Sequence, residues 1–251
     1  MPPAQGQAAK RRFGDFAIDC VGRDGLVAWC AADVAARHRP PRVVMDVNGH
    51  ALSLARTDPA YRAQVAQADI IHADGGFLVT LSRRLAGPAI PERSATTDMI
   101  HDFAAHFART GGSFFLLGGE EATNAEAARR LADSYPGLRI AGRHHGYFTD
   151  AEEPQVAGLI DRSGADVVWV GLGKPREQAV ALRLRDRVSA CWIITCGGCF
   201  NYITGAYPRA PRWMQKANLE WLHRLATDPR RLFRRYALTN PHALWIALTR
   251  H

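Results

Sequence analysis

Three glycine-rich segments of this sequence have residue types suited to holding a phosphate group. They are residues 73–76 (ADGG), 116–120 (LLGGE) and 171–175 (GLGKP), and each follows or ends an apolar run that predicts a strand. In a parallel sheet the loops after the strands meet at one edge, where backbone N–H groups and helix N-termini bind anions. The segments predict a site for a phosphate-bearing ligand, with candidate binding residues Gly75, Gly118, Gly119, Gly171, Gly173 and Lys174.

Asp74 is the candidate catalytic residue of the first segment. It follows an apolar strand and precedes two glycines, so its carboxylate is expected at the carboxyl edge of the sheet, where a general base is useful. The alternative is an N-cap, the commonest role of aspartate at a strand-to-helix turn, and spacing alone slightly favours it. Asn48, just after the run VVMDV, has two similar readings: a hydrogen bond to a sugar, or closure of a turn.

The elements that must position these residues alternate between strand and helix. No segment matches G-x-G-x-x-G or G-x-x-x-x-G-K-[ST], which disfavours an NAD-binding site and a P-loop. Apolar runs predict strands, and patterns of helical period between them predict helices, in a βαβ series that indicates a buried parallel sheet. The predicted strands are 41–47, 68–76, 113–119, 138–142, 165–173 and 189–198, and the predicted helices are 51–68, 76–85, 97–110, 120–137, 150–164 and 175–187.

The fold class is therefore α/β, a Rossmann-like and mostly parallel sheet with flanking helices and a C-terminal α-helical appendage. We expect a disordered tail over residues 1–14, the α/β domain over 15–205 and the appendage over 206–251. In the appendage, Asp228 is placed to cap a helix that begins at Pro229. Helical spacing puts Arg231, Arg234 and Arg235 on one side of that helix and Leu232, Phe233 and Tyr236 on the other.

Composition narrows the class of partner. The chain has 251 residues, is 47% hydrophobic and carries a net charge of +8, which points to an anionic partner. No apolar run is long enough to span a bilayer, and the N-terminal residues do not form a signal peptide, so we expect a cytoplasmic protein. The five cysteines fit reduced thiols, and the pair Cys196 and Cys199 reads better as a buried strand end than as a metal or redox site.

Six segments, read in order, resemble the WecG/TagA/CpsF glycosyltransferases, family twenty-six. The resemblance runs from about residue 40 to about residue 240 and is most specific over residues 197–236. The segments are ADGGFLVTLSRRLAGPAIPERSATTDM, FLLGG, HHGYF, VGLGKPREQ, GGCFNYITGAYPRAPRWMQKANLEWLHRL and DPRRLFRRY. The resemblance implies an inverting enzyme with a Rossmann-like domain and a C-terminal appendage implicated in membrane association.

The resemblance also assigns residues. The family's proposed catalytic aspartate, in a D-G motif, falls on Asp74, which reverses the preference for a cap. The family asparagine falls on Asn48, and the P-E-R motif ends at Arg93. The appendage arginines implicated in activity fall on Arg224, Arg231 and Arg234.

Three positions depart from the family pattern. Asp46 replaces a threonine and adds a carboxylate that either opposes a donor diphosphate or replaces Asp74 as the base. Glu177 stands at the family's glutamine position, with Gln178 beside it. Asn201 replaces an aspartate and cannot act as a base. The identity of the donor sugar depends most on these three positions.

The implied reaction moves a hexose-type sugar from a UDP-sugar to a polyprenyl-diphosphate-linked glycan in bacterial cell-surface polysaccharide synthesis. The sugar belongs to the class of N-acetylmannosamine, its uronic acid or glucose. The enzyme would work peripherally at the cytoplasmic face of the inner membrane, touching an anionic lipid surface, without a cofactor, metal or nucleic acid, and a homo-oligomer is compatible with this reading. The alternative is a nucleotide-binding regulatory protein whose basic tail binds a partner or nucleic acid.

Overall fold

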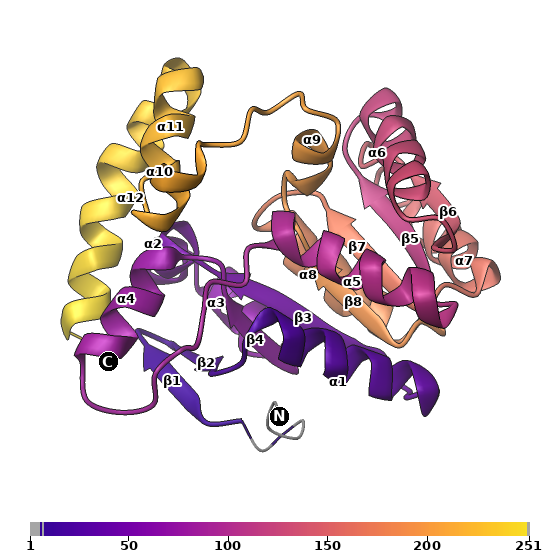
Figure 1. The fold of residues 1–251 in the computed structure, drawn as a ribbon, viewed down its shortest axis with the longest axis horizontal. Helices are drawn as coiled ribbons and strands as arrows, with labels where there is room; N and C mark the ends of the chain where they lie inside the picture. The colour runs from indigo at the N-terminus through magenta and orange to yellow at the C-terminus, as the bar shows by residue number, and fades with distance from the viewer. Residues whose placement is uncertain (1–5, 7, 250–251) are drawn as a thin grey trace.

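Six parallel strands form one sheet in the order β4-β3-β8-β7-β5-β6 (Figure 1). The computed structural model describes residue 6 and residues 8–249, with all their side chains except those of Lys216, Arg231, Arg234, Arg235, Tyr236 and Leu238. The strands are β3 (Arg42–Val47), β4 (Ile70–Ala73), β5 (Ser113–Gly118), β6 (Arg139–His144), β7 (Val167–Gly171) and β8 (Trp192–Thr195). The predicted α/β class and its parallel sheet are confirmed.

The strands are buried on both faces because alternate side chains enter two separate cores. Along β3, Val43 and Met45 pack into one core and Val44 into the other. Helices α1 (Arg23–Ala35), α5 (Thr96–Thr110), α6 (Glu121–Ser134) and α9 (Cys199–Ile203) cover one face. The other face is covered by α2 (Gly49–Thr57), α3 (Pro59–Val65), α4 (Gly76–Arg84), α7 (Glu153–Ser163) and α8 (Arg176–Arg185).

Two expectations about the N-terminal half were wrong. Residues 10–14 do not belong to a disordered tail, because β1 (Lys10–Phe13) pairs with β2 (Phe16–Asp19) in an antiparallel hairpin that buries Phe13 fully. The helix predicted over 51–68 is two helices, because the Asp58 side chain caps Tyr61 N–H at 2.9 Å and Pro59 starts a new helix. Residues 1–5 and 7 of the predicted tail lie outside the described residues.

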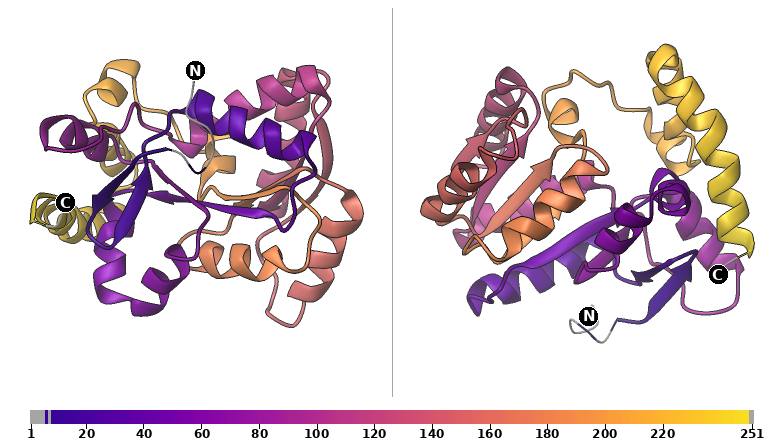
Figure 2. Two further views of the ribbon diagram at one scale, coloured as in Figure 1. Left: turned by 90° about the horizontal axis from the view of Figure 1, so that it is seen from below. Right: turned by 180° about the vertical axis from the view of Figure 1, so that it is seen from behind.

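The C-terminal segment is helical, as predicted, and the structure describes no strand within residues 206–249. Its helices are α10 (Arg212–Lys216), α11 (Glu220–Thr227) and α12 (Pro229–Thr249), and α12 continues through Pro241. The end of α12 lies beside the β1–β2 hairpin (Figure 2). There Ala243, Ile246 and Ala247 are buried in the same core as Phe13.

The predicted two-sided pattern at the start of α12 is only partly right. Leu232 is 7% exposed and lines a cavity, whereas its neighbour Phe233 is 65% exposed, so these two apolar side chains do not share one face. A turn of about 100° per residue separates them. Arg231, Arg234, Arg235 and Tyr236 lie outside the described side chains.

Candidate active site

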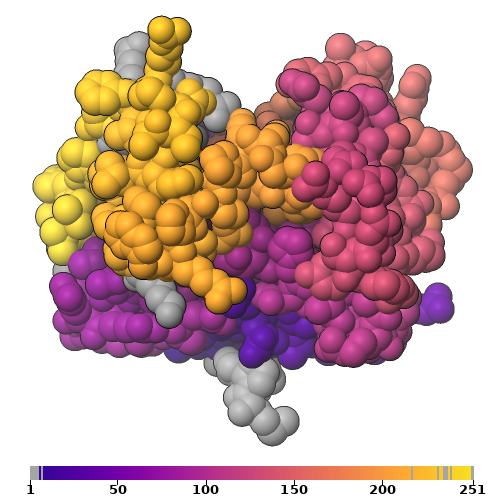
Figure 3. Space-filling model, turned by 45° about the horizontal axis from the view of Figure 1, so that its top comes forward, coloured from indigo at the N-terminus to yellow at the C-terminus, as the bar shows by residue number. Residues whose placement is uncertain are grey.

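A cavity of about 600 Å³ opens at the carboxyl edge of the sheet. It is lined by residues that follow β3, β4, β7 and β8, four adjacent strands, and by residues of the C-terminal helices. Figure 3 shows the surface hollowed between the C-terminal helices, in gold and yellow, and the magenta and red side of the molecule. The edge of the sheet predicted for ligand binding is thus the edge that holds the cavity.

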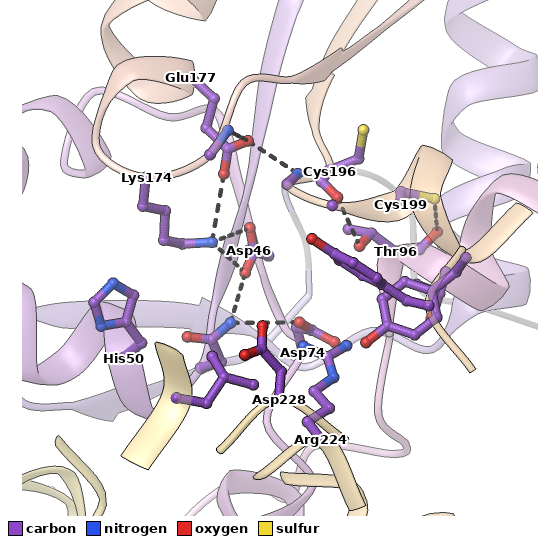
Figure 4. Close-up of a pocket in the computed structure, with 18 of the residues that line it drawn as sticks. Asp46, His50, Asp74, Thr96, Lys174, Glu177, Cys196, Cys199, Arg224 and Asp228 are labelled. Carbon is purple, nitrogen blue, oxygen red and sulfur yellow. Dashed lines mark hydrogen bonds and ion pairs between the residues drawn. The ribbon is translucent and has the colours of Figure 1, made fainter. Parts of the chain in front are cut away.

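Asp46 and Lys174 form a buried ion pair at the base of the cavity, although 128 residues separate them (Figure 4). Lys174 Nζ donates to both carboxylate oxygens of Asp46, at 2.6 and 2.7 Å, and lies 3.6 Å from Glu177 Oε1. Burial opposes the charge of Asp46, but Lys174, His72 and the hydrogen bonds to the carboxylate together outweigh burial and hold the pKa of Asp46 below its usual value. Asp46 is therefore a carboxylate paired with Lys174, and its lowered pKa makes it a weaker base than an ordinary aspartate.

Glu177 is fully buried and organises two loops. Its Oε2 accepts hydrogen bonds from the backbone N–H groups of Gly173, at 3.1 Å, and Gly197, at 2.9 Å. Gln178 Nε2 donates to Glu177 Oε1 at 3.3 Å, and burial raises the pKa of the Glu177 carboxyl. Glu177 thus joins the loop after β7 to the loop after β8, and Gln178 supports it from a fully buried position.

Asn48 connects the two candidate carboxylates. Its Nδ2 donates to Asp46 Oδ2 at 3.1 Å and to Asp74 Oδ2 at 3.4 Å. Its Oδ1 accepts from Ala51 N–H at 3.1 Å and caps α2. Asn48 therefore closes the turn between β3 and α2, as one of its two readings predicted, and it also lines the cavity.

Asp74 holds the position predicted for it, just beyond β4 with its side chain 20% exposed. Gly75, not Asp74, is the N-cap of α4, so the capping reading fails. Burial raises the pKa of the Asp74 carboxyl, and Asp46 adds to this, whereas Arg93, Arg224 and Lys174 oppose it. The carboxylate is thus exposed to the cavity and more basic than an ordinary aspartate.

Arg93 ties the C-terminal helices to Asp74. Its Nε donates to the Asp74 carbonyl at 2.8 Å and its Nη2 lies 3.4 Å from Asp74 Oδ1. On its other side, Nη1 donates to Glu220 Oε2 at 2.6 Å. Glu220 starts α11, so the position of Arg93 beside Asp74 depends on the appendage.

A second cavity of about 320 Å³ adjoins the first, and Asp74, Asn48, Arg93 and Arg224 line both. Its remaining lining includes Phe77, Trp221 and Leu244, so it is the more apolar of the two. Arg224 lies over the Tyr202 ring at 4.8 Å, and Figure 4 shows it with Asp228 at the same end of the first cavity as Asp74. Asp74 therefore stands where the two cavities meet.

Several predicted phosphate-binding glycines serve packing instead. A Cβ atom on Gly118 would lie 2.2 Å from the Gly171 carbonyl oxygen, so these two glycines let β5 and β7 approach closely. Among the described lining residues of either cavity, Gly118, Gly119, Gly171 and Asn201 do not occur. Gly173 and Lys174 line the larger cavity and Gly75 the smaller one, so the structure gathers only part of the predicted set.

The residues that line the cavities but were not predicted for the site include Thr96, Thr97, Gly198 and Glu220. The two threonines are the first residues of α5, and Gly198 lies in the turn after β8. A local signal existed for the two threonines, because they stand at the start of a predicted helix. Gly198 was assigned to the end of a predicted strand. Glu220 gave no local signal, because its partner Arg93 is 127 residues away.

The described residues contain no group of three or more His, Cys, Asp or Glu side chains arranged to hold a metal. All five cysteines are free thiols, and Cys196 and Cys199 are buried. Within the described chain, no helix has the length and apolarity needed to cross a bilayer.

Together the fold and the site define an α/β enzyme with a basic carboxylate at the strand ends of a parallel sheet. The model of the glycosyl transferase WecG/TagA/CpsF family matches residues 11–251. The chain therefore belongs to this family, and it is a glycosyltransferase of cell-surface polysaccharide synthesis. The match extends the resemblance seen in the sequence to β1 and to the end of α12.

Proposed function

We propose that this enzyme transfers a hexose-type sugar, with inversion, from a UDP-sugar to a polyprenyl-diphosphate-linked glycan. The sugar is of the class of N-acetylmannosamine, its uronic acid or glucose. The observation that carries the proposal is the place of Asp74, whose basic carboxylate lies where a polar cavity meets a more apolar one. A nucleotide sugar suits the first cavity, and the end of a lipid-linked acceptor suits the second.

In this proposal Asp74 acts as the general base. The acceptor hydroxyl oxygen attacks the anomeric carbon, its proton passes to the Asp74 carboxylate, and the bond between that carbon and the UDP oxygen breaks. UDP leaves with the bonding electron pair, which places negative charge on the diphosphate. The raised pKa of Asp74 supports this role because a base works best when its pKa approaches the working pH.

The neighbouring residues hold the base and the leaving group. Asn48 orients Asp74 by its hydrogen bond, and Arg93 supplies positive charge beside it. Arg224 lines the cavity from α11 and is placed to bind a diphosphate oxygen. Asp46 and Lys174 act indirectly. Their ion pair fixes the Asp46 carboxylate, which accepts a hydrogen bond from the Asn48 amide.

The pH profile tests the assignment of the base. Activity is lost when Asp74 is protonated, so kcat/KM should fall as pH drops through its pKa, and the acid limb should lie above the ordinary value of 3.8. Arg93→Gln removes the largest opposing charge and should move the limb to still higher pH. Arg42→Gln is the matched control, since Arg42 pairs with Asp33 at the far end of β3 with similar exposure. An acid limb that Arg93→Gln leaves in place would contradict the assignment.

We also propose that residues 206–251 associate the enzyme peripherally with the cytoplasmic face of the inner membrane. The support is the exposure of Trp213, at 64%, and Phe233, at 65%, on helices rich in arginine. Aromatic side chains beside basic ones are typical of surfaces that lie on anionic lipid. Arg224 lines both cavities, which supports the proposal that the C-terminal helices contact both the lipid and the diphosphate.

Charge reversal tests the membrane contact. Changing Arg231, Arg234 and Arg235 to glutamate should reduce sedimentation with anionic liposomes, because each basic residue near such a surface contributes on the order of 1 kcal/mol. Changing Arg12, Arg109 and Arg162, which are exposed on β1, α5 and α7, is the control of equal charge. Equal loss in both triple variants would show a general charge effect and no specific surface.

A donor screen tests the function as a whole. The full chain in detergent, with a polyprenyl-diphosphate acceptor, is offered a panel of UDP-sugars, and release of UDP and extension of the acceptor are measured together. Transfer from one donor with inversion of the anomeric configuration is the expected result. No transfer from any UDP-sugar, with acceptor and protein intact, would contradict the proposal.

A further inference from the structure

The side chains around the larger cavity do not supply a surplus of positive charge for a diphosphate. Among the described lining residues there are four carboxylates, Asp46, Asp74, Glu177 and Asp228, and three cationic groups, Lys174, Arg93 and Arg224. Lys174 already faces Asp46, and Arg93 already faces Asp74 and Glu220. A bound diphosphate therefore needs further donors.

The first turn of α5 offers such donors at the cavity wall. The helix has 15 residues and starts at Thr96, and its N-cap, Ala95, has no side-chain oxygen to satisfy the first amides. Asp98 and Met99 N–H bond to the Ala95 carbonyl at 2.9 and 2.8 Å, whereas the structure describes no acceptor for the N–H groups of Thr96 and Thr97. Both threonines line the cavity, so these amides, at the positive end of the helix dipole, are placed for an anion.

The Thr97 side chain gives an independent sign of a ligand. It is only 7% exposed, and its Oγ1 has no hydrogen-bond partner among the described residues. A buried hydroxyl without a partner is unfavourable, typically by about 1–3 kcal/mol, and natural proteins contain few of them. At a cavity wall, a bound acceptor oxygen would satisfy it.

The turn after β8 packs directly against this helix start. Thr96 Oγ1 donates to the Cys196 carbonyl at 3.5 Å, and Cys199 Sγ lies 3.6 Å from the Thr96 carbonyl oxygen, as Figure 4 shows. Glu177 takes the Gly197 N–H, whereas the described part of the chain provides no acceptor for the Gly198 N–H. Gly198 lines the cavity, so its amide joins those of Thr96 and Thr97 on one wall.

We propose that the first turn of α5, with the Thr97 hydroxyl and the Gly198 amide, binds the diphosphate of the donor. The inference rests on the proposed function for the identity of the donor, but this site would bind the diphosphate group of any ligand that carries one. Neutral N–H donors at a helix start can stabilise the charge that grows on the leaving diphosphate without adding a cation beside Asp74. This wall replaces the loop at 116–120, which the sequence suggested for phosphate binding.

The Thr97→Val variant tests the hydroxyl. We expect about tenfold or more weaker binding of UDP, measured by calorimetry on the full chain, with unchanged binding of uridine, because only the diphosphate loses a donor. The melting temperature should stay the same or rise, since the hydroxyl has no protein partner to lose. Thr110→Val, at the exposed end of the same helix, is the control and should change neither ligand. Equal UDP affinity in Thr97→Val and wild type would overturn the role of the hydroxyl.

Titration with inorganic diphosphate tests the site without relying on the nucleotide. In amide NMR spectra of the full chain, the Thr96, Thr97 and Gly198 resonances should shift together as diphosphate is added. Shifts at other cavity residues with these three unmoved would overturn the proposal. This outcome is distinct from failure of the proposed function, which would appear as absence of sugar transfer in the donor screen.

Discussion

Replacing Asp74 by asparagine is expected to lower kcat by about a hundredfold or more, the loss typical of a missing general base. The amide keeps the shape of the side chain, and its one oxygen can still accept a hydrogen bond from either Asn48 or Arg93, so the fold and UDP affinity should be retained. Steady-state kinetics, calorimetry with UDP and thermal melting on one preparation measure the three quantities.

Asp228→Asn is the control for this prediction, because Asp228 is another carboxylate that lines the same cavity. It should retain far more activity than Asp74→Asn. If Asp228→Asn loses a hundredfold and Asp74→Asn does not, the base has been assigned to the wrong carboxylate. Asp74→Glu should recover part of the rate, since it restores a carboxylate in a shifted position.

Replacing Lys174 by methionine is expected to reduce the free energy of unfolding by about 3–5 kcal/mol, the cost of leaving a buried charge without its partner. For a chain of this size the melting temperature should fall by about 6–20 °C. Asp46 and Glu177 are 3% and 0% exposed, so water solvates these carboxylates far less well than the lost ammonium did. Denaturant unfolding and thermal melting at neutral pH measure both effects.

The pH dependence of this loss has a defined sign. Without Lys174 the buried carboxyls have pKa values above those of the unfolded chain, so the folded variant binds more protons than the unfolded one. Its stability therefore rises as pH falls, and the deficit relative to wild type should shrink in acid. Arg129→Met breaks a pair with Glu126 in which the arginine side chain is 60% exposed, and should change the free energy of unfolding far less, because water solvates both charges. A deficit in Lys174→Met no larger than that control would contradict the buried-pair interpretation.

The period and length of the apolar patterns in the sequence were enough to predict the parallel sheet. The segments around Val44, Leu116 and Ile194 each contain consecutive apolar residues, which is typical of strands covered on both faces. The hairpin formed by β1 was missed because KRRF carries three cationic residues in four, and because Phe13 is buried in a core that includes side chains of α12, far along the chain. A local pattern cannot report such a contact.

The site was predicted where a motif sits on one strand end and missed where partners come from different segments. Asp74 and Asn48 each follow a strand directly, so sequence placed them correctly. The pairing of Asp46 with Lys174 turns an apparent second base into a structural ion pair, and only the fold reveals it. Gly118 was predicted to bind phosphate, but its lack of a Cβ is explained by the close approach of Gly171 on the neighbouring strand, which a local sequence pattern does not show.

Because α12 buries Ala243, Ile246 and Ala247, membrane binding by this helix would change the stability of the rest of the protein. Since α12 shares a core with the sheet, a lipid surface that engages the helices of residues 206–249 is a ligand of the folded chain as a whole. By mass action such a ligand raises the melting temperature of every element that unfolds with α12. A bilayer bound in this way would stabilise the catalytic domain, and removal of α12 would expose part of that domain's interior to water.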